Sequence, residues 1–234
     1  MTVGRLLLWR HGRTPANATM RLQGQIDEPL DEVGRWQART AAAALLARYA
    51  PTAIVSSDLS RARATADYLA RDVAAPVVLD ERLRERSFGC WEGMSGDDIS
   101  ARWPQEFAAW RAGADPEGVD AEPRAQVAAR LGVAVREHAA ALGPSDTLVV
   151  VSHGAAIALA TGELLDQPPS WRGVMGLRNA HWAELSPSRG DVAPGWRLHG
   201  FNIGPTDASR DWDAGPDHAA TPADDATAET RDPD

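Results

Sequence analysis

The sequence predicts a three-layer α/β/α fold with a mostly parallel central sheet. Short apolar runs alternate with longer segments of helical character along most of the chain, which is typical of strands joined by crossover helices. These runs are apolar throughout rather than at every second residue, which indicates strands covered on both faces. With 234 residues, 44% of them apolar, the chain can bury a sizeable core.

In the first half of the chain, Arg5–Arg10 is a continuous apolar run and is expected to be a buried strand. A loop that contains glycine and proline follows it. Residues 31–49 are expected to form a helix, because two acids stand at its start and Pro51 lies beyond its end. The remaining expected elements are a strand at 53–56, a helix at 59–71 capped by Ser57 or Asp58, and a strand at 77–79.

The second half continues the alternation after an interruption at 90–123. An alanine-rich helix is expected at 124–142, because Gly143 and Pro144 end it. The apolar run at 147–151 is the clearest strand of the set and precedes a helix at 154–165. Two late strands are expected at 181–185 and 196–201.

We divide the chain into one main domain at 1–204 and an acidic tail at 205–234. The stretch of about 90–123 carries three tryptophans and mixed charge, and is expected to be a small insertion over the site. The tail is rich in Asp, Ala, Thr and Pro, a composition that predicts disorder. We expect no function for it.

Composition excludes several classes of function. The net charge is −9, and most of it lies in the tail, so the body offers no basic surface for nucleic acid. No apolar run is long enough to span a bilayer, and Arg10 and His11 interrupt the N-terminal run, so neither a membrane protein nor an exported one is expected. Cys90 is the only cysteine, which excludes an internal disulfide and favours a cytoplasmic location.

Charged and polar side chains follow several of the expected strands. Arg10 and His11 stand where the first strand ends, Arg61 follows the second strand, and His153 follows the strand of the second half. Glu85 lies shortly after the third strand. Because open parallel sheets bind ligands at the carboxyl ends of their strands, we expect these side chains to meet at one site.

This set of residues is suited to phosphoryl transfer. A phosphate monoester is a dianion and needs fixed positive charge, which Arg10, Arg61 and a protonated His153 could supply. A neutral imidazole at His11 can act as nucleophile if its other nitrogen is held, for instance by the backbone near Gly12. Glu85 is then the candidate to protonate the leaving alkoxide and to deprotonate water in the second half-reaction.

Each of these residues has an ordinary alternative. Glu85 stands among three arginines and could belong to a plain ion-pair cluster, and Arg61 could be a surface residue. A metal-dependent hydrolase that uses His11, Asp58 and His153 is a further alternative, although no metal-binding spacing supports it. A module that binds a phosphorylated ligand without catalysis would lack the nucleophile or the acid, and both are present.

Taken together, the motifs resemble the histidine phosphatase superfamily, which includes the phosphoglycerate mutases. The resemblance covers roughly residues 5–203. It rests on the segments Arg10-His11-Gly12, Ser56 to Arg61, Arg84-Glu85 with Phe88-Gly89, Trp91-Glu92-Gly93, and Val151 to Gly154, and on Asn17, Gln23-Gly24, Asp27, Pro29-Leu30 and Gly34. It implies a phosphoglycerate mutase-like fold.

The resemblance also implies roles for particular residues. His11 would be the phosphorylated residue and Glu85 the proton donor, with no metal and no cofactor. The residues that would bind the phosphate or the substrate are Arg10, Asn17, Gln23, Gly24, Arg61 and His153. The substrate would be a small phosphorylated metabolite, and a homodimer is a reasonable expectation.

One departure from the family pattern bears on the reaction. Mutases of the family carry two consecutive arginines in the insertion, whereas Arg111 and Arg124 are far apart in this sequence. A mutase must retain its intermediate, so we expect hydrolysis and keep phosphoglycerate mutase as the alternative. Within the superfamily, the chain resembles the phosphatases of glucosyl-3-phosphoglycerate at Gln23-Gly24-Gln25, at 54–59, at Asn179-Ala180-His181-Trp182 and at Trp196-Arg197-Leu198. This resemblance makes glucosyl-3-phosphoglycerate one candidate substrate, beside other sugar phosphates and a broad range of phosphomonoesters.

Overall fold

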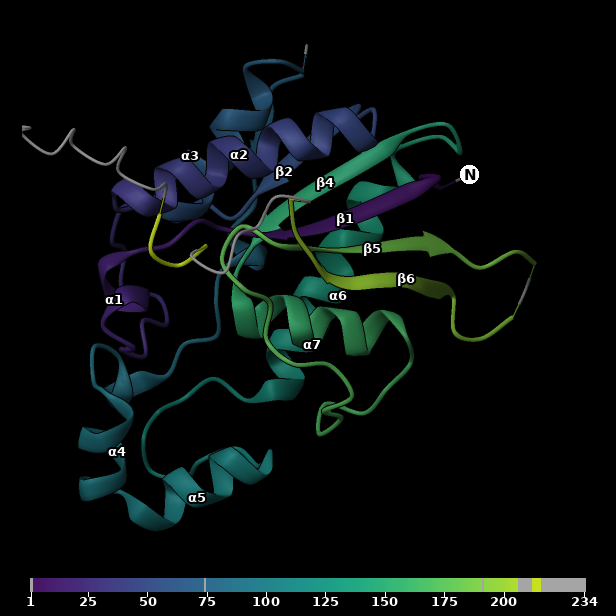
Figure 1. Cartoon of the computed structure of the whole chain (residues 1–234). Helices are drawn as coiled ribbons and strands as arrows, with labels where there is room; N and C mark the ends of the chain where they lie inside the picture. The colour runs from purple at the N-terminus through teal and green to yellow at the C-terminus, as the bar shows by residue number, and fades with distance from the viewer. Residues whose placement is uncertain (1, 74, 191, 206–211, 216–234) are drawn as a thin grey trace, which may run out of the picture.

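The chain folds around a six-stranded sheet in the order β3-β2-β4-β1-β5-β6, as Figure 1 shows. The computed structural model describes residues 2–73, 75–190, 192–205 and 212–215. Strands β1 to β4 are parallel, β5 pairs antiparallel with β1, and β6 with β5. The strands are β1 (Arg5–Arg10), β2 (Ala53–Ser56), β3 (Val77–Leu79), β4 (Thr147–Ser152), β5 (Trp182–Pro187) and β6 (Trp196–Ile203). The predicted mostly parallel sheet is confirmed.

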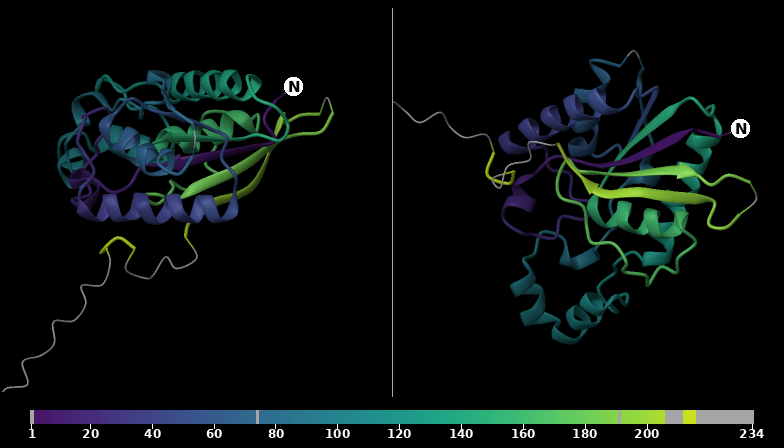
Figure 2. Two further views of the ribbon diagram at one scale, coloured as in Figure 1. Left: turned by 90° about the horizontal axis from the view of Figure 1, so that it is seen from above. Right: turned by 45° about the vertical axis from the view of Figure 1, so that its right-hand side comes forward.

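Helices cover both faces of this sheet. Helices α2 and α3 lie on one side and α6 and α7 on the other, and the sheet lies between the two layers when seen from above (Figures 1 and 2). The helices are α1 (Pro15–Ala18), α2 (Glu32–Arg48), α3 (Ser60–Ala70), α4 (Gly96–Arg102), α5 (Pro104–Ala112), α6 (Arg124–Ala140) and α7 (Gly154–Leu164), with short 3-10 turns η1 (Glu81–Leu83) and η2 (Gly89–Trp91). The predicted three layers are confirmed.

Successive residues of the central strands pack against different helical layers. Leu6 and Leu8 of β1 pack into the cluster with α6 and α7, whereas Leu7 and Trp9 pack into the cluster with α2 and α3. The same division holds along β4, all of whose residues are buried. Successive side chains of a strand point to opposite faces, so a strand covered on both faces must be apolar at every position.

The insertion forms a small lobe with a core of its own. Helices α4 and α5 lie beside the main domain (Figure 1), where Trp91 is buried against Trp103, Phe107 and Trp110. Helix α4 begins at a capping box made by Ser95 and Asp98. The sequence analysis expected an insertion here but predicted neither helix.

The predicted cap of α3 is wrong. The helix begins at Ser60, and neither Ser57 nor Asp58 caps it. Both side chains instead bond distant residues: the Asp58 carboxylate pairs with Arg84, and the Ser57 hydroxyl lies 2.9 Å from His153 Nε2. Tertiary partners therefore outweigh the local preference of these residues for a helix start.

Most of the tail predicted to be disordered, 205–234, lies outside the described residues, but residue 205 and residues 212–215 are described. Trp212 is fully buried, its ring lies 4.9 Å from that of Trp36, and its Nε1 donates to Asn179 O at 2.9 Å. The composition of the tail did not predict that Trp212 packs against the domain, because disorder is inferred from averages over many residues.

No helix in the described ranges is long and apolar enough to cross a membrane.

Candidate active site

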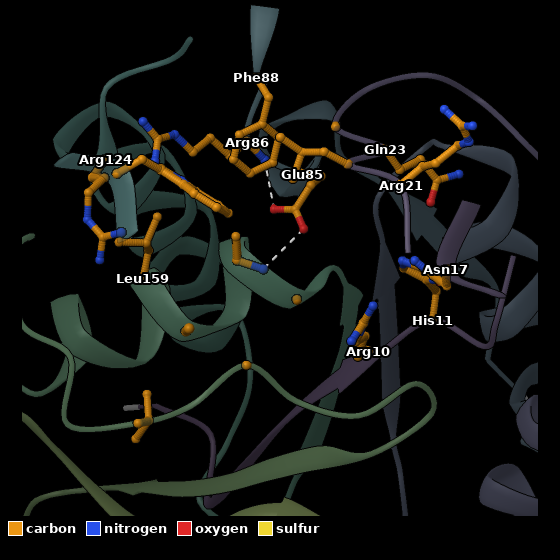
Figure 3. Close-up of a pocket in the computed structure, with 18 of the residues that line it drawn as sticks. Arg10, His11, Asn17, Arg21, Gln23, Glu85, Arg86, Phe88, Arg124 and Leu159 are labelled. Carbon is orange, nitrogen blue, oxygen red and sulfur yellow. Dashed lines mark hydrogen bonds between the residues drawn. The ribbon is translucent and has the colours of Figure 1, made fainter. Parts of the chain in front are cut away.

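The carboxyl ends of β1, β2 and β4 bring the predicted residues together at one edge of the sheet. Arg10 is the partner of Ser152 in the β1–β4 register, so His11 and His153 follow at neighbouring positions, with ring centroids 5.1 Å apart. A cavity of about 580 Å³ opens above them, between the sheet edge and the insertion. Seven of the eight predicted residues line it: Arg10, His11, Asn17, Gln23, Gly24, Arg61 and Glu85 (most are labelled in Figure 3). The eighth, His153, is fully buried beneath.

His11 is held as a neutral imidazole. Its Nδ1 lies 2.7 Å from Gly12 O, and because a carbonyl can only accept, Nδ1 carries the proton. Burial, and then the charges of Arg61 and Arg10, hold the pKa of His11 well below its usual value. The Nε2 lone pair is therefore free at neutral pH, which is the state that a nucleophilic imidazole requires.

The loop that carries His11 lies directly on the first turn of α2. A Cβ on Gly12 would meet Gly34 O at 2.3 Å, so only glycine fits there. The His11 carbonyl in turn accepts from Ala180 N at 3.0 Å and from Asn179 Nδ2 at 3.2 Å. Asn179 Nδ2 also donates to Asn17 Oδ1 at 2.9 Å, which leaves the Asn17 amide NH₂ for the cavity. The sequence analysis gave Asn179 no role in the site, because that role depends entirely on tertiary contacts.

His153 differs from its expected state. Arg61 Nε donates to His153 Nδ1 at 3.2 Å, so the proton of the ring lies on Nε2, which donates to Ser57 Oγ at 2.9 Å. Burial, followed by the charges of Arg61, His11 and Arg10, lowers the pKa of His153 well below its usual value. The protonated His153 that the sequence analysis considered is therefore absent from this structure, and a direct contribution of His153 to phosphate binding stays a prediction.

The buried Arg61 and the half-buried Arg10 supply positive charge. Burial lowers the pKa of Arg61 to about 10, so its guanidinium remains charged at neutral pH while it donates to Gly24 O and Ile26 O. Arg10 donates to Leu177 O, and its Nε has no partner in the described part of the chain. Nε2 of the buried Gln23 is also without a partner there. Unpartnered buried donors are rare and costly, so these two atoms favour an anion in the cavity.

Glu85 lies across the cavity at the start of α7. Its Oε1 accepts from Ala156 N at 2.9 Å and Arg86 N at 2.8 Å, and its Oε2 from Ala155 N at 3.1 Å (Figure 3 marks bonds of this carboxylate). Among the described residues no arginine forms an ion pair with Glu85, which removes the ion-pair alternative. The neighbouring arginines bond other acids: Arg82 pairs with Asp80, Arg84 with Asp58 and Arg86 with Asp115.

Five further arginines line the cavity: Arg21, Arg86, Arg111, Arg124 and Arg172. Arg86 and Arg124 lie in the part of the cavity far from His11, whereas Arg21 lies beside Gln23 (Figure 3). Arg86 Nη2 donates to Asp115 Oδ1 at 2.8 Å, whereas Arg124 bonds that carboxylate only through its backbone N–H and its Nε donates to Pro169 O at 2.8 Å. Burial lowers the pKa of both guanidinium groups, and the like charge of a neighbouring arginine lowers each further, Arg124 for Arg86 and Arg172 for Arg124. Arg111 and Arg124, far apart in sequence, thus face one cavity. The absence of consecutive arginines therefore does not mean that a second anion site is absent.

Among the described residues, no group of three or more His, Cys, Asp and Glu side chains is placed to hold a metal ion. The alternative with His11, Asp58 and His153 as ligands fails on particular contacts. Asp58 bonds Arg84 instead, and both nitrogens of His153 are engaged by Arg61 and Ser57.

Comparison with known proteins agrees with this geometry. Residues 6–203 match the histidine phosphatase superfamily (branch 1). The chain is 40% identical over 216 residues to the glucosyl-3-phosphoglycerate phosphatase of Mycolicibacterium vanbaalenii, covering 86% of this chain and 96% of the relative. It is 32% identical over 198 residues to a probable phosphoglycerate mutase, GpmB, of Photorhabdus laumondii, covering 81% and 88%. The solved structure of a mycobacterial glucosyl-3-phosphoglycerate phosphatase with VO3 superposes with a TM-score of 0.77 at 40% identity, covering 85% of this chain and 98% of that one.

A sheet edge with a neutral histidine, buried arginines and a facing carboxylate defines a phosphoryl-transfer enzyme, and the chain belongs to the histidine phosphatase superfamily. Within that superfamily it is a phosphatase.

The neutral histidines predict that the protein loses stability in mild acid. Below pH 6.5 the unfolded chain binds protons at His11 and His153 that the folded chain does not, so the free energy of unfolding falls as the pH decreases. Between pH 7.5 and 5.5 the expected loss is about 1.4 kcal/mol for each of the two histidines. Urea denaturation at the two pH values measures it, and equal stabilities would show that the buried rings accept protons freely.

Proposed function

We propose that the chain hydrolyses phosphate monoesters of small acidic metabolites, with glucosyl-3-phosphoglycerate as the candidate substrate, through a phosphohistidine at His11. The observation that carries this proposal is the neutral His11 ring with Nδ1 bonded to Gly12 O, beside the charged Arg61 and the unpartnered Nε of Arg10. Nucleophile and anion donors thus share one cavity.

In the first step, His11 Nε2 attacks phosphorus and the bond to the ester oxygen breaks. Glu85, which must carry a proton when the ester is bound, gives that proton to the leaving alkoxide. The donors of Arg10, Arg61, Asn17 and Gln23 line the same cavity and would bind the three remaining phosphate oxygens. The bond from Nδ1 to Gly12 O stabilises the ring while Nε2 carries the phosphoryl group.

In the second step, the Glu85 carboxylate takes a proton from water as the water oxygen attacks phosphorus. The phosphorus–nitrogen bond breaks, inorganic phosphate forms, and His11 returns to its neutral state. Glu85 is protonated again, so protons and charges balance over the cycle. No step calls for a metal ion, and we expect activity to survive a chelator and to be inhibited by vanadate.

The far arginines support a substrate with a second acidic group. Arg86 forms an ion pair with Asp115, whereas the Arg124 side chain bonds a neutral carbonyl, Pro169 O, so this part of the cavity keeps excess positive charge. The half-buried Trp110 and Trp171 line the same cavity and could pack against a sugar. The mycobacterial relatives are named for glucosyl-3-phosphoglycerate. This compound has both a carboxylate and a sugar.

A panel of substrates tests this proposal. We expect kcat/KM to be highest for glucosyl-3-phosphoglycerate, lower for 3-phosphoglycerate and lowest for glycerol 3-phosphate, which lacks the carboxylate. Arg124→Met should raise KM for the two acids by about tenfold to a hundredfold, the value of a charge-assisted contact, and leave glycerol 3-phosphate almost unchanged. Arg39→Met, on the exposed face of α2, is the matched control. Equal effects of Arg124→Met on all three substrates would contradict the assignment.

The same arginines make phosphoglycerate mutase a candidate second activity beside hydrolysis, because a mutase also binds an acid beside the phosphate. The two activities have different products from 3-phosphoglycerate, namely inorganic phosphate for hydrolysis and the 2-phospho isomer for the mutase. Phosphorus NMR of one reaction separates them. We also propose three features that the sequence analysis expected. They are a phosphatase domain at 1–204 with an insertion at about 90–123, a homodimer, and a cytoplasmic location.

A further inference from the structure

The segment that carries Glu85 belongs to no helix or strand. Residues 84–88 run between η1 and η2, and their backbone carbonyls have no sheet ladder to bond. The guanidinium of Arg130 bonds these carbonyls instead. Arg130 of α6 donates from Nη1 to Arg82 O and Arg84 O, both at 2.7 Å, and from Nη2 to Glu85 O at 3.0 Å.

The remaining donors of Arg130 bond a single carboxylate. Nε donates to Glu122 Oε1 at 2.7 Å and Nη2 to Glu122 Oε2 at 2.9 Å. Glu122 holds the same segment from its other side, because Glu122 N donates to Ser87 O at 2.9 Å and Arg86 Nε donates to Glu122 O at 2.7 Å. The side chains of Arg130 and Glu122 are 20% and 17% exposed, so water competes little for these bonds.

This contact uses the whole donor set of an arginine. A guanidinium has five N–H groups in a fixed plane, and Arg130 makes five bonds with three carbonyls and one carboxylate. A lysine has three donors on one atom and cannot reach the same acceptors together. The arrangement fixes the backbone of Glu85 relative to α6, while the first turn of α7 fixes its carboxylate.

We propose that Arg130 is a positioning residue for the proton donor of the reaction, acting through the backbone of Glu85. The inference rests on the proposed function, in which Glu85 protonates the leaving oxygen. Proton transfer needs hydrogen-bond contact between Glu85 and that oxygen, and a displacement of about 1 Å can cost on the order of a hundredfold in rate.

A positioning role has a signature that loss of stability does not. An alkyl phosphate expels a strongly basic alkoxide and needs the proton, whereas p-nitrophenyl phosphate expels a stable phenolate and does not. The ratio kcat/KM reports the steps up to departure of the alcohol, so hydrolysis of the phosphoenzyme does not affect it. An enzyme with a misplaced Glu85 therefore loses kcat/KM on alkyl phosphates selectively.

The test compares Arg130→Lys and Arg130→Met with the native enzyme on glycerol 3-phosphate and p-nitrophenyl phosphate. We expect kcat/KM for glycerol 3-phosphate to fall by about tenfold to a hundredfold, and that for p-nitrophenyl phosphate by less than about threefold. Arg136→Met is the control, because Arg136 lies on the same helix but bonds Glu163 of α7 at 3.1 Å, and it should leave both values unchanged. If Arg130→Met does not fold, Arg130→Lys decides.

Glu85→Ala, measured beside these variants, separates two kinds of failure. If Glu85→Ala loses kcat/KM selectively on glycerol 3-phosphate and Arg130→Lys does not, the positioning role is overturned and the proton donor stands. If Glu85→Ala shows no selectivity, both assignments fall. The double variant with Arg130→Lys and Glu85→Ala should lose no more kcat/KM on glycerol 3-phosphate, relative to p-nitrophenyl phosphate, than Glu85→Ala alone. Both changes act on the same proton transfer from Glu85. Additive selectivity would overturn the inference.

Discussion

Replacement of His11 by asparagine is expected to lower kcat by about four orders of magnitude or more, the loss typical of a removed nucleophile. Asparagine can keep the bond to Gly12 O through its side-chain nitrogen, but it has nothing in place of Nε2. The fold should survive, because the loop is also held by Ala180 N and Asn179 Nδ2. Steady-state phosphate release and thermal denaturation measure the two quantities.

A trapping experiment shows whether the lost residue is the nucleophile. Native enzyme quenched during turnover of ³²P-labelled substrate should carry label that is stable in alkali and labile in acid, and the His11→Asn variant should carry none. His138→Asn is the matched control, because His138 bonds Asp80 at the far end of α6 and should keep full activity. Labelled protein in the His11→Asn variant would assign the phosphoryl group to another residue.

Removal of Glu85 has the second largest expected effect. Glu85→Ala should lower kcat/KM for alkyl phosphates by about 10² to 10⁴, the usual contribution of a general acid, and that for p-nitrophenyl phosphate far less. Alanine is a better test than glutamine here. Both oxygens of Glu85 accept from backbone N–H groups, and a glutamine would turn its NH₂ group toward one of them.

The same variant tests the second half-reaction. With p-nitrophenyl phosphate the phosphoenzyme should form normally and hydrolyse slowly, because water has lost its base. Stopped-flow absorbance should then show a burst of nitrophenolate close to one equivalent of enzyme. Glu163→Gln, which changes a carboxylate of α7 that bonds Arg136, is the control. A Glu85→Ala variant without a burst would leave the assignment of the base unsupported.

Much of the site was predictable because it follows strand ends. The apolar runs of β1 and β4 locate Arg10, His11 and His153, and parallel strands end at the same edge, so their meeting was expected. The bond from His11 to the Gly12 backbone was also expected and is present. These predictions succeed because strand pattern and strand direction are properties of short segments.

The state of His153 was not predictable in this way. Its neutral form depends on Arg61 Nε at one ring nitrogen and Ser57 Oγ at the other, two contacts that no local pattern specifies. Ser57 was expected to cap α3, a local role that the tertiary contact outweighs. The pKa of a buried group is set by its desolvation and its neighbours, and both exist only in the folded chain.

The amino-acid sequence by itself determined the layers of the fold, the sheet edge at which the cavity opens, and the presence of His11, Arg61 and Glu85 in the lining of that cavity. Only the tertiary structure decided the five bonds of Arg130, the burial of Trp212 and the gathering of Arg111 with Arg124. Hydrophobic periodicity acts over a few neighbouring residues and is visible in the sequence. Hydrogen-bond partners and shared cavities join residues that only the packed chain brings together, and their geometry is fixed by distances that the sequence does not contain.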